Sequence, residues 1–75
     1  MPEVKIDSLY KHFKGMIVQV IILAKDSETL EDVVVYEHID NNEIWVRPLA
    51  EFISKVDKEK YPDVTQEYRF EEIQE

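Results

Sequence analysis

The longest apolar run of the chain, MIVQVIILA at residues 16–24, follows its only glycine, Gly15. Several of these residues are β-branched and apolar residues occupy both alternating sets, which is typical of a strand covered on both faces. A buried helix is the alternative, but the glycine before the run and the polar segment KDSETLED at 25–32 after it favour a strand and a hairpin loop. The run is far short of the roughly 20 residues that span a bilayer as a helix.

Two further strands are predicted on either side of a tight turn. VVVYEHI at 33–39 is followed by DNN at 40–42, whose residues tolerate the left-handed conformation that tight hairpins need. EIWVR at 43–47 comes next. The two-residue period of a strand places Trp45 and Arg47 on one face of it.

The rest of the chain gives weaker signals. Pro48 ends the third strand and suits the start of a helical or 3₁₀ turn over 48–52, in which Leu49 and Phe52 share a face. ISKV at 53–56 alternates like a fourth strand, and VTQEYRFEEI at 64–73 is either a last strand or an acidic tail. About five short strands predict a mostly β fold, either a small SH3-like barrel or a strongly curled antiparallel sheet.

The 75 residues are enough for one domain, near the lower size limit for a single core. We expect a loose lead-in at 1–8 and the β domain at 9–73. Hydrophobic residues make up 44% of the chain and charged residues 35%, a balance that fits a folded protein. The chain has no cysteine, and the charges scattered through its first residues do not fit a signal peptide, so the expected location is the cytoplasm.

The net charge of −8 is unevenly distributed. Residues 1–25 contain four lysines and two acids, whereas residues 26–75 contain 15 acids and five bases. Because nucleic-acid binding depends on neutralising phosphates, an acidic chain is a poor general binder unless its few bases cluster. A nucleic-acid partner is therefore disfavoured without being excluded, and no membrane partner is expected.

Two short signatures, YKHFKG at 10–15 and WVRP at 45–48, combine aromatic, basic and turn-forming residues. Gly15 ends the first of them and is predicted to supply a positive φ or a close backbone approach. His12 is the best candidate for acid–base chemistry, but no nucleophile is near it in sequence, so a structural or ligand-contacting role is favoured. Arg47, beside Trp45, suits stacking or anion binding; alternatively, Trp45 covers the core and Arg47 pairs with an acid.

In these signatures the chain resembles the bacterial domain of unknown function 1653 family over residues 8–73. The motifs that carry the resemblance occur in the family's order: Tyr10, His12-Phe13-Lys14-Gly15, Ala24, Ser27-Glu28-Thr29, Val34-Val35-Tyr36, Trp45-Val46-Arg47-Pro48 and Phe52. The resemblance implies an SH3-like β-barrel, usually a stand-alone small protein, with no established activity. Asp26 replaces a histidine and Met16 and Ile17 replace aromatic residues of the family, so no role of those residues transfers here.

Metal, cofactor and catalytic sites are not predicted. His38 with Glu37 and Asp40 has metal-ligating side chains, but a solvated loop histidine is the favoured interpretation. The chain has no glycine-rich nucleotide loop and no Ser/His/Asp order, so we predict no catalytic residue and rank an enzyme last.

Two functional hypotheses remain. The first is a non-catalytic binding module for a peptide, an anionic metabolite or a nucleic-acid segment, with a surface made of Tyr10, His12, Lys14, Trp45 and Arg47. The second is a structural or interaction protein that acts through self-association or docks on a larger complex, because a small core and open strand edges invite a partner.

Overall fold

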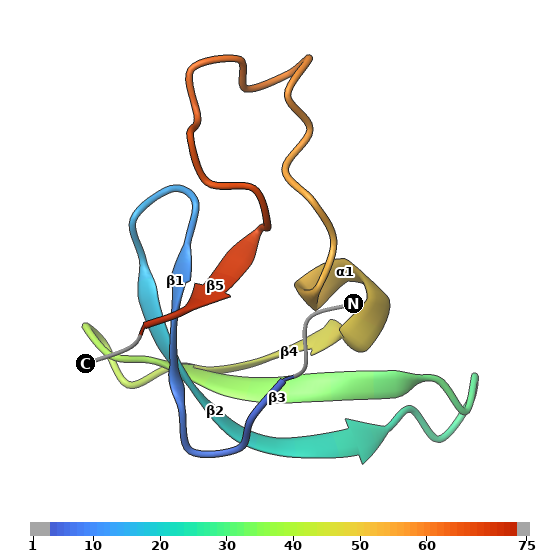
Figure 1. The fold of residues 1–75 in the computed structure, drawn as a ribbon. Coiled ribbons are helices and arrows are strands. Elements are labelled where there is room, and N and C mark those ends of the chain that lie inside the picture. The colour runs from blue at the N-terminus through green and yellow to red at the C-terminus, as the bar shows by residue number, and fades with distance from the viewer. Residues whose placement is uncertain (1–3, 74–75) are drawn as a thin grey trace.

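The computed structural model describes residues 4–73, and these form five antiparallel strands in one sheet (Figure 1). The elements are, in chain order, β1 (Leu9–His12), β2 (Ile17–Lys25), β3 (Asp32–His38), β4 (Ile44–Pro48), α1 (Leu49–Phe52) and β5 (Phe70–Glu72). The strand order β4-β3-β2-β1-β5 makes β4 and β5 the two edges. The predicted mostly β fold is confirmed, in the form of a curled sheet that does not close. The predicted domain also includes residues 1–3 and 74–75, which lie outside the described residues.

Strand β2 bends in its middle. Val18 and Val20 are fully buried, and the register with β3 shifts between Val20 and Ile22, where a β-bulge inserts one extra residue. A bulge bends its strand and increases the local twist. Beyond it, Ile22 and Leu23 are 51% and 40% exposed. The prediction that this run is covered on both faces is therefore wrong for its second half, because helix α1 and the core lie on one face of the sheet.

Two tight turns contain residues with positive φ. Gly15 has a φ of 102° and closes the β1–β2 hairpin, where its N–H donates to the carbonyl oxygen of His12 at 2.8 Å. A Cβ at Gly15 would meet no atom within 4 Å, so the backbone conformation alone favours glycine there, as predicted. Asn42, in the predicted turn at 40–42, has a φ of 61° and joins β3 to β4.

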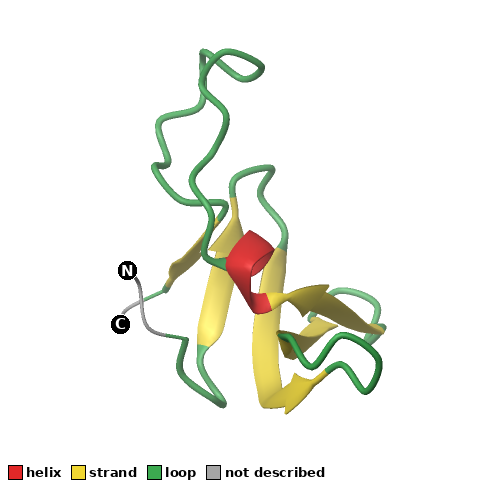
Figure 2. Ribbon diagram, turned by 90° about the vertical axis from the view of Figure 1, so that its right-hand side faces the viewer, coloured by secondary structure: helices red, strands yellow, loops and turns green. Residues whose placement is uncertain are grey.

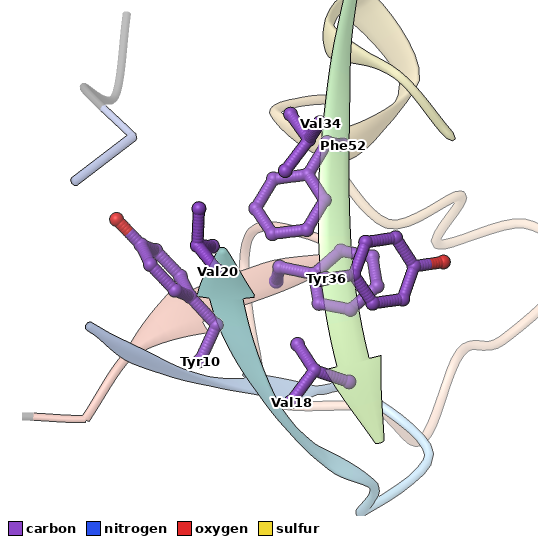
Figure 3. Close-up of a cluster of buried hydrophobic side chains, with 7 residues drawn as sticks. Tyr10, Val18, Val20, Val34, Tyr36 and Phe52 are labelled. Atoms are coloured by element: carbon purple, nitrogen blue, oxygen red, sulfur yellow. The ribbon is translucent and has the colours of Figure 1, made fainter. Parts of the chain in front are cut away.

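The core lies on the face of the sheet that α1 covers (Figure 3). Its centre is an aromatic stack, in which the rings of Phe52 and Phe70 are 4.1 Å apart and within 4° of parallel. Leu49 packs against the same cluster, which confirms the helical turn predicted at 48–52 and the shared face of its two apolar residues. Helix α1 has four residues, and no helix within residues 4–73 is long and apolar enough to cross a membrane.

Residues 53–69, which we call the arm, project beyond the sheet between α1 and β5 (Figures 1 and 2). Its two sides meet at a single bridge between Lys55 and Tyr68. The strand predicted at 53–56 is therefore only this bridge. Of the two alternatives for 64–73, a strand or an acidic tail, the strand forms and is confined to β5.

Side chains rather than a strand ladder hold the outer part of the arm. The Nζ of Lys58 donates to the carbonyl oxygens of Val64 and Gln66 at 2.6 and 2.8 Å. The Nε2 of Gln66 donates to the carbonyl oxygen of Lys11 at 2.9 Å, which ties the arm to β1. Because side chains satisfy these carbonyl groups, the arm keeps a defined shape without pairing as strands.

Residues 4–8, predicted as a loose lead-in, are bonded to β2. The N–H of Asp7 donates to the carbonyl oxygen of Val20 at 2.8 Å, and the N–H of Val20 donates to that of Ser8 at 3.0 Å. Val4 packs against the core cluster. The sheet thus extends its contacts to the residues before β1, a strand that the sequence pattern did not predict.

Candidate functional site

A cavity of about 220 Å³ opens beside the core, between β4 and the β1–β2 hairpin. We call it the aromatic pocket, and its lining residues are His12, Met16, Val18, Tyr36, His38, Trp45, Arg47 and Phe70. They come from strands β1 to β5 and the turn between β1 and β2, so only the folded sheet brings them together.

Strand pairing explains why Trp45 and Arg47 reach this pocket together. Trp45 pairs with Tyr36 and Arg47 with Val34, and both of these β3 residues are buried in the core. Paired residues lie on the same face of a sheet, so the shared face predicted for Trp45 and Arg47 is confirmed. Trp45 is 51% exposed, which makes it a wall of the pocket rather than a core residue.

The guanidinium of Arg47 is held at the inner end of the pocket. Its Nε donates to the hydroxyl of Tyr36 at 3.4 Å, and its Cζ lies 5.7 Å from the centre of the Phe70 ring. Its ion pair with Glu51, at 3.7 Å, involves an exposed carboxylate and contributes at most about 1 kcal/mol. Most of the donor capacity of Arg47 therefore remains available.

His12 is 7% exposed and is the one buried charged or polar residue among residues 4–73. Its ring stacks on Phe13 at 4.4 Å and meets Phe70 edge-on at 4.9 Å. Burial, followed by the positive charges of Arg47, Arg69 and Lys14 and by His38, lowers the pKa of His12 from 6.5 to about 4. The imidazole is therefore neutral at physiological pH.

A second hollow, of about 360 Å³, lies on the other side of His12. We call it the cationic pocket, and its lining residues are His12, Phe13, Lys14, Arg47, Val56, Asp57, Lys60, Tyr61 and Arg69. The Nζ atoms of Lys14 and Lys60 each lie 5.5 Å from the centre of the Tyr61 ring. The Nε of Arg69 is buried and has no hydrogen-bond partner.

The cationic pocket has four basic side chains and one carboxylate. That carboxylate, Asp57, already accepts hydrogen bonds from the backbone N–H groups of Glu59 and Lys60 at 3.0 and 3.3 Å. Within residues 4–73 no ion pair involves Lys14, Lys60 or Arg69. Unpaired positive charge is thus concentrated at one place in a chain whose net charge is −8.

Of the five residues proposed from the sequence, the structure brings His12, Lys14, Trp45 and Arg47 to these two pockets. Tyr10 lies elsewhere. It is buried against Phe52, and its hydroxyl accepts a hydrogen bond from the N–H of Lys5 at 2.9 Å. Figure 3 shows the hydroxyls of Tyr10 and Tyr36 at opposite sides of the core cluster.

Other residues of the two pockets have no clear signal in the sequence. Lys60 and Arg69 belong to the arm, and each looks like an ordinary surface base among acids. His38 could have been placed by the two-residue period that puts it on the same face as Tyr36. Its ring lies 5.5 Å from that of Trp45.

The histidine weighed as a metal ligand has aromatic neighbours in the structure. The His38 ring contacts those of Tyr36 and Trp45, and within residues 4–73 no three His, Asp or Glu side chains form a group that could hold a metal ion. That the protein uses no metal or cofactor stays a prediction.

Comparison with known proteins agrees with the motifs. The model of the family described as "Protein of unknown function (DUF1653)" matches residues 8–72. No curated protein and no solved structure matches the chain, so the SH3-like character implied by the resemblance stays a prediction. The family match spans nearly the whole chain and contains both signatures, and the chain belongs to the DUF1653 family.

Proposed function

We propose that this protein is a non-catalytic binding module that holds an anionic ligand in the two pockets around His12. The observation that carries the proposal is the group of four basic side chains, Lys14, Arg47, Lys60 and Arg69, with one already occupied carboxylate among them. His12, Lys14, Trp45 and Arg47, the four predicted residues that line the pockets, would contact the ligand.

Electrostatics favour an anion at this place despite the acidic chain. Exposed charges more than about 8 Å apart are largely screened at physiological ionic strength, so nearby cations dominate inside a pocket. Crowded positive charges that outnumber the nearby carboxylates repel one another, and an anion reduces this repulsion. Each hydrogen bond to a charged group contributes about 1.5–3 kcal/mol.

The same geometry favours binding over proton transfer. A general base works best with a pKa near the working pH, and burial and the surrounding cations hold the pKa of His12 at about 4. Among the described residues, none that lines either pocket is a serine, threonine or cysteine. A ligand there meets mainly hydrogen-bond donors and aromatic rings, which suit binding.

The proposal is tested by titrating the ¹⁵N-labelled protein with sodium phosphate at constant ionic strength. We expect saturable shifts of amides around His12, and Arg69→Gln to weaken binding at least tenfold. Lys25→Gln is the matched control, because it removes one positive charge from an exposed ion pair with Asp32, outside both pockets. Equal losses in the two variants, or no saturable shift, would refute a specific anion site.

Strand β4 favours a second candidate function, self-association. The N–H of His38 donates to the carbonyl oxygen of Glu43 at 2.8 Å, which makes this a hydrogen-bonded pair of the ladder. Such pairs alternate in antiparallel sheets, so the backbone groups of Ile44 and Val46 point away from β3. Their side chains are 64% and 61% exposed.

A second copy of the chain suits this edge. In an antiparallel β4–β4 pair, Ile44 of each copy lies opposite Val46 of the other copy. The outward N–H groups of these four residues then donate to carbonyl oxygens across the interface. The apolar side chains of each opposed pair also pack against each other. Sedimentation equilibrium over a dilution series tests this candidate. We expect a dimer that Val46→Lys converts to a monomer; a wild-type monomer at every concentration rules the candidate out.

A further inference from the structure

The two pockets are neighbours with common walls. His12 and Arg47 line both of them, and no other residue within 4–73 does. On one side of these two residues lie Lys14 and Arg69, and on the other lie His38 and Trp45. A ligand that touches both His12 and Arg47 can therefore place one part among cations and another part among rings.

The donors of the cationic pocket fit a group with several oxygen atoms. The N–H of Lys14 donates to Nδ1 of His12 at 3.1 Å, so the neutral ring carries its hydrogen on Nε2. A second donor, the buried Nε of Arg69, has no hydrogen-bond acceptor within residues 4–73. Arg47 and Lys14 add further donors.

The charge of this pocket distinguishes between anions. A phosphate monoester carries between −1.5 and −2 charges at neutral pH and has three strong acceptor oxygens. A carboxylate has one charge and two oxygens. Lys14, Lys60 and Arg69 lack ion pairs within residues 4–73, so the unpaired charge exceeds what one carboxylate neutralises.

The size of the aromatic pocket limits the other part of the ligand. Its volume of about 220 Å³ compares with an engineered apolar cavity of about 150 Å³ that binds benzene. One ring or one fused ring pair fits this space. The exposed faces of Trp45 and Met16 form its walls, and aromatic rings and thioethers are good partners for a planar ring.

We propose that the ligand of this site is a phosphate monoester that carries an aromatic ring, with its phosphate between Lys14, Arg47 and Arg69 and its ring against Trp45. This inference rests on the proposed function and names its ligand class. His12, at the boundary, donates from Nε2 to the phosphate.

Calorimetric titration with four probes tests the ligand class. The probes are inorganic phosphate, phenyl phosphate, adenosine 5′-monophosphate and phenylacetate. We expect one or both aromatic phosphates to bind at least ten times more tightly than inorganic phosphate and phenylacetate. In phenyl phosphate the ring is attached directly to the phosphate, whereas in the nucleotide a sugar lies between them. Comparing these two probes therefore distinguishes a simple aryl phosphate from a nucleotide as the ligand.

Two equally exposed residues on different strands, Trp45 on β4 and Ile22 on β2, provide matched variants. Trp45→Ala should weaken binding of the aromatic phosphate at least fivefold and leave inorganic phosphate unchanged. Ile22→Ala, at an equally exposed position outside both pockets, should change neither. Both side chains are more than half exposed, so neither substitution should prevent folding.

The outcomes separate the inference from the proposed function. If inorganic phosphate binds as tightly as both aromatic phosphates, the anion site stands and the aromatic requirement is overturned. Tighter binding of phenylacetate than of phenyl phosphate overturns the phosphate assignment. If none of the four probes binds, the proposed function fails together with the inference.

Discussion

The backbone N–H of Lys14 donates to Nδ1 of His12 across the turn that ends β1. This 3.1 Å hydrogen bond uses the Nδ1 lone pair, which leaves the neutral ring as a donor through Nε2. The YKHFKG signature therefore fixes both the place and the tautomer of its histidine. The consequences can be measured.

The first prediction concerns the ionisation of His12. Its ring protons, followed by NMR, should titrate with a pKa of about 4, because burial and the cations Arg47, Arg69 and Lys14, together with His38, disfavour the imidazolium. Saturation with inorganic phosphate should raise this pKa, because a nearby anion stabilises the charged ring. A midpoint near 6.5 in the free protein would contradict the arrangement of these charges.

The second prediction concerns stability in acid. Above pH 6.5 His12 is neutral in the folded and the unfolded chain, whereas between 6.5 and about 4 only the unfolded chain binds the proton. Stability should therefore fall as the pH falls through this window. Between pH 7.5 and 4.5 the loss from His12 is on the order of 2–3 kcal/mol, at 1.36 kcal/mol for each unit of pKa difference.

Urea unfolding at the two pH values measures this loss. His12→Gln keeps a donor near the Nε2 position and does not titrate, so its stability should fall by roughly 2–3 kcal/mol less than that of the wild type. Carboxylates common to both proteins cancel in the comparison. Equal falls in the two proteins would show that His12 does not control the acid response.

The third prediction concerns the aromatic core. Phe52→Ala should destabilise the protein by about 3–5 kcal/mol, because Phe52 is fully buried and stacks on Phe70 at 4.1 Å. A loss of this size approaches the whole stability expected of so small a domain. Thermal unfolding followed by circular dichroism gives the value, and Glu59→Ala at an exposed site of the arm should change it by less than about 0.5 kcal/mol.

The fourth prediction concerns the first hairpin. Gly15→Ala should destabilise the protein by about 1–2 kcal/mol, although its Cβ would meet no atom within 4 Å, because a side chain disfavours a φ of 102°. Gly15→Asn should cost less, since asparagine tolerates positive φ better than alanine. If both substitutions lower the stability equally, the positive φ of Gly15 is not the reason for the loss.

Residue patterns predicted the strands and turns that depend on neighbouring residues in the sequence. The strands within 16–24, 33–39 and 43–47 and the turn at Asn42 follow from β-branched residues and turn chemistry. Strand β1 escaped prediction because its four residues include a lysine and a histidine; its period of two is visible only once Tyr10 and His12 are seen to be buried.

The arm shows why the end of the chain was harder to predict. ISKV at 53–56 alternates like a strand, but strand formation also requires a partner ladder. Instead, the side chains of Lys58 and Gln66 donate hydrogen bonds to carbonyl oxygens of the arm. Hydrogen bonds from these side chains to distant carbonyl oxygens cannot be predicted from the pattern of neighbouring residues.

The candidate site was predictable where it depends on a strand period. The face shared by Trp45 and Arg47 followed from their spacing, whereas Arg69 meets Arg47 only because β4 and the end of the arm converge in space. Tyr10 was placed in the surface because it belongs to the same signature as His12. Both point into the core from β1, but towards different sides of it.

The bulge in β2 has a consequence for chain length. Ile21 is the residue without a partner of its own, and the pairs on either side, Val20 with Tyr36 and Ile22 with Val35, would join into one unbroken ladder without it. A deletion of this single residue would thus preserve every pair of the hairpin and remove the bend. Family members that differ in length by one residue here should therefore keep the same strand pairing and differ in how far the sheet curls around the site.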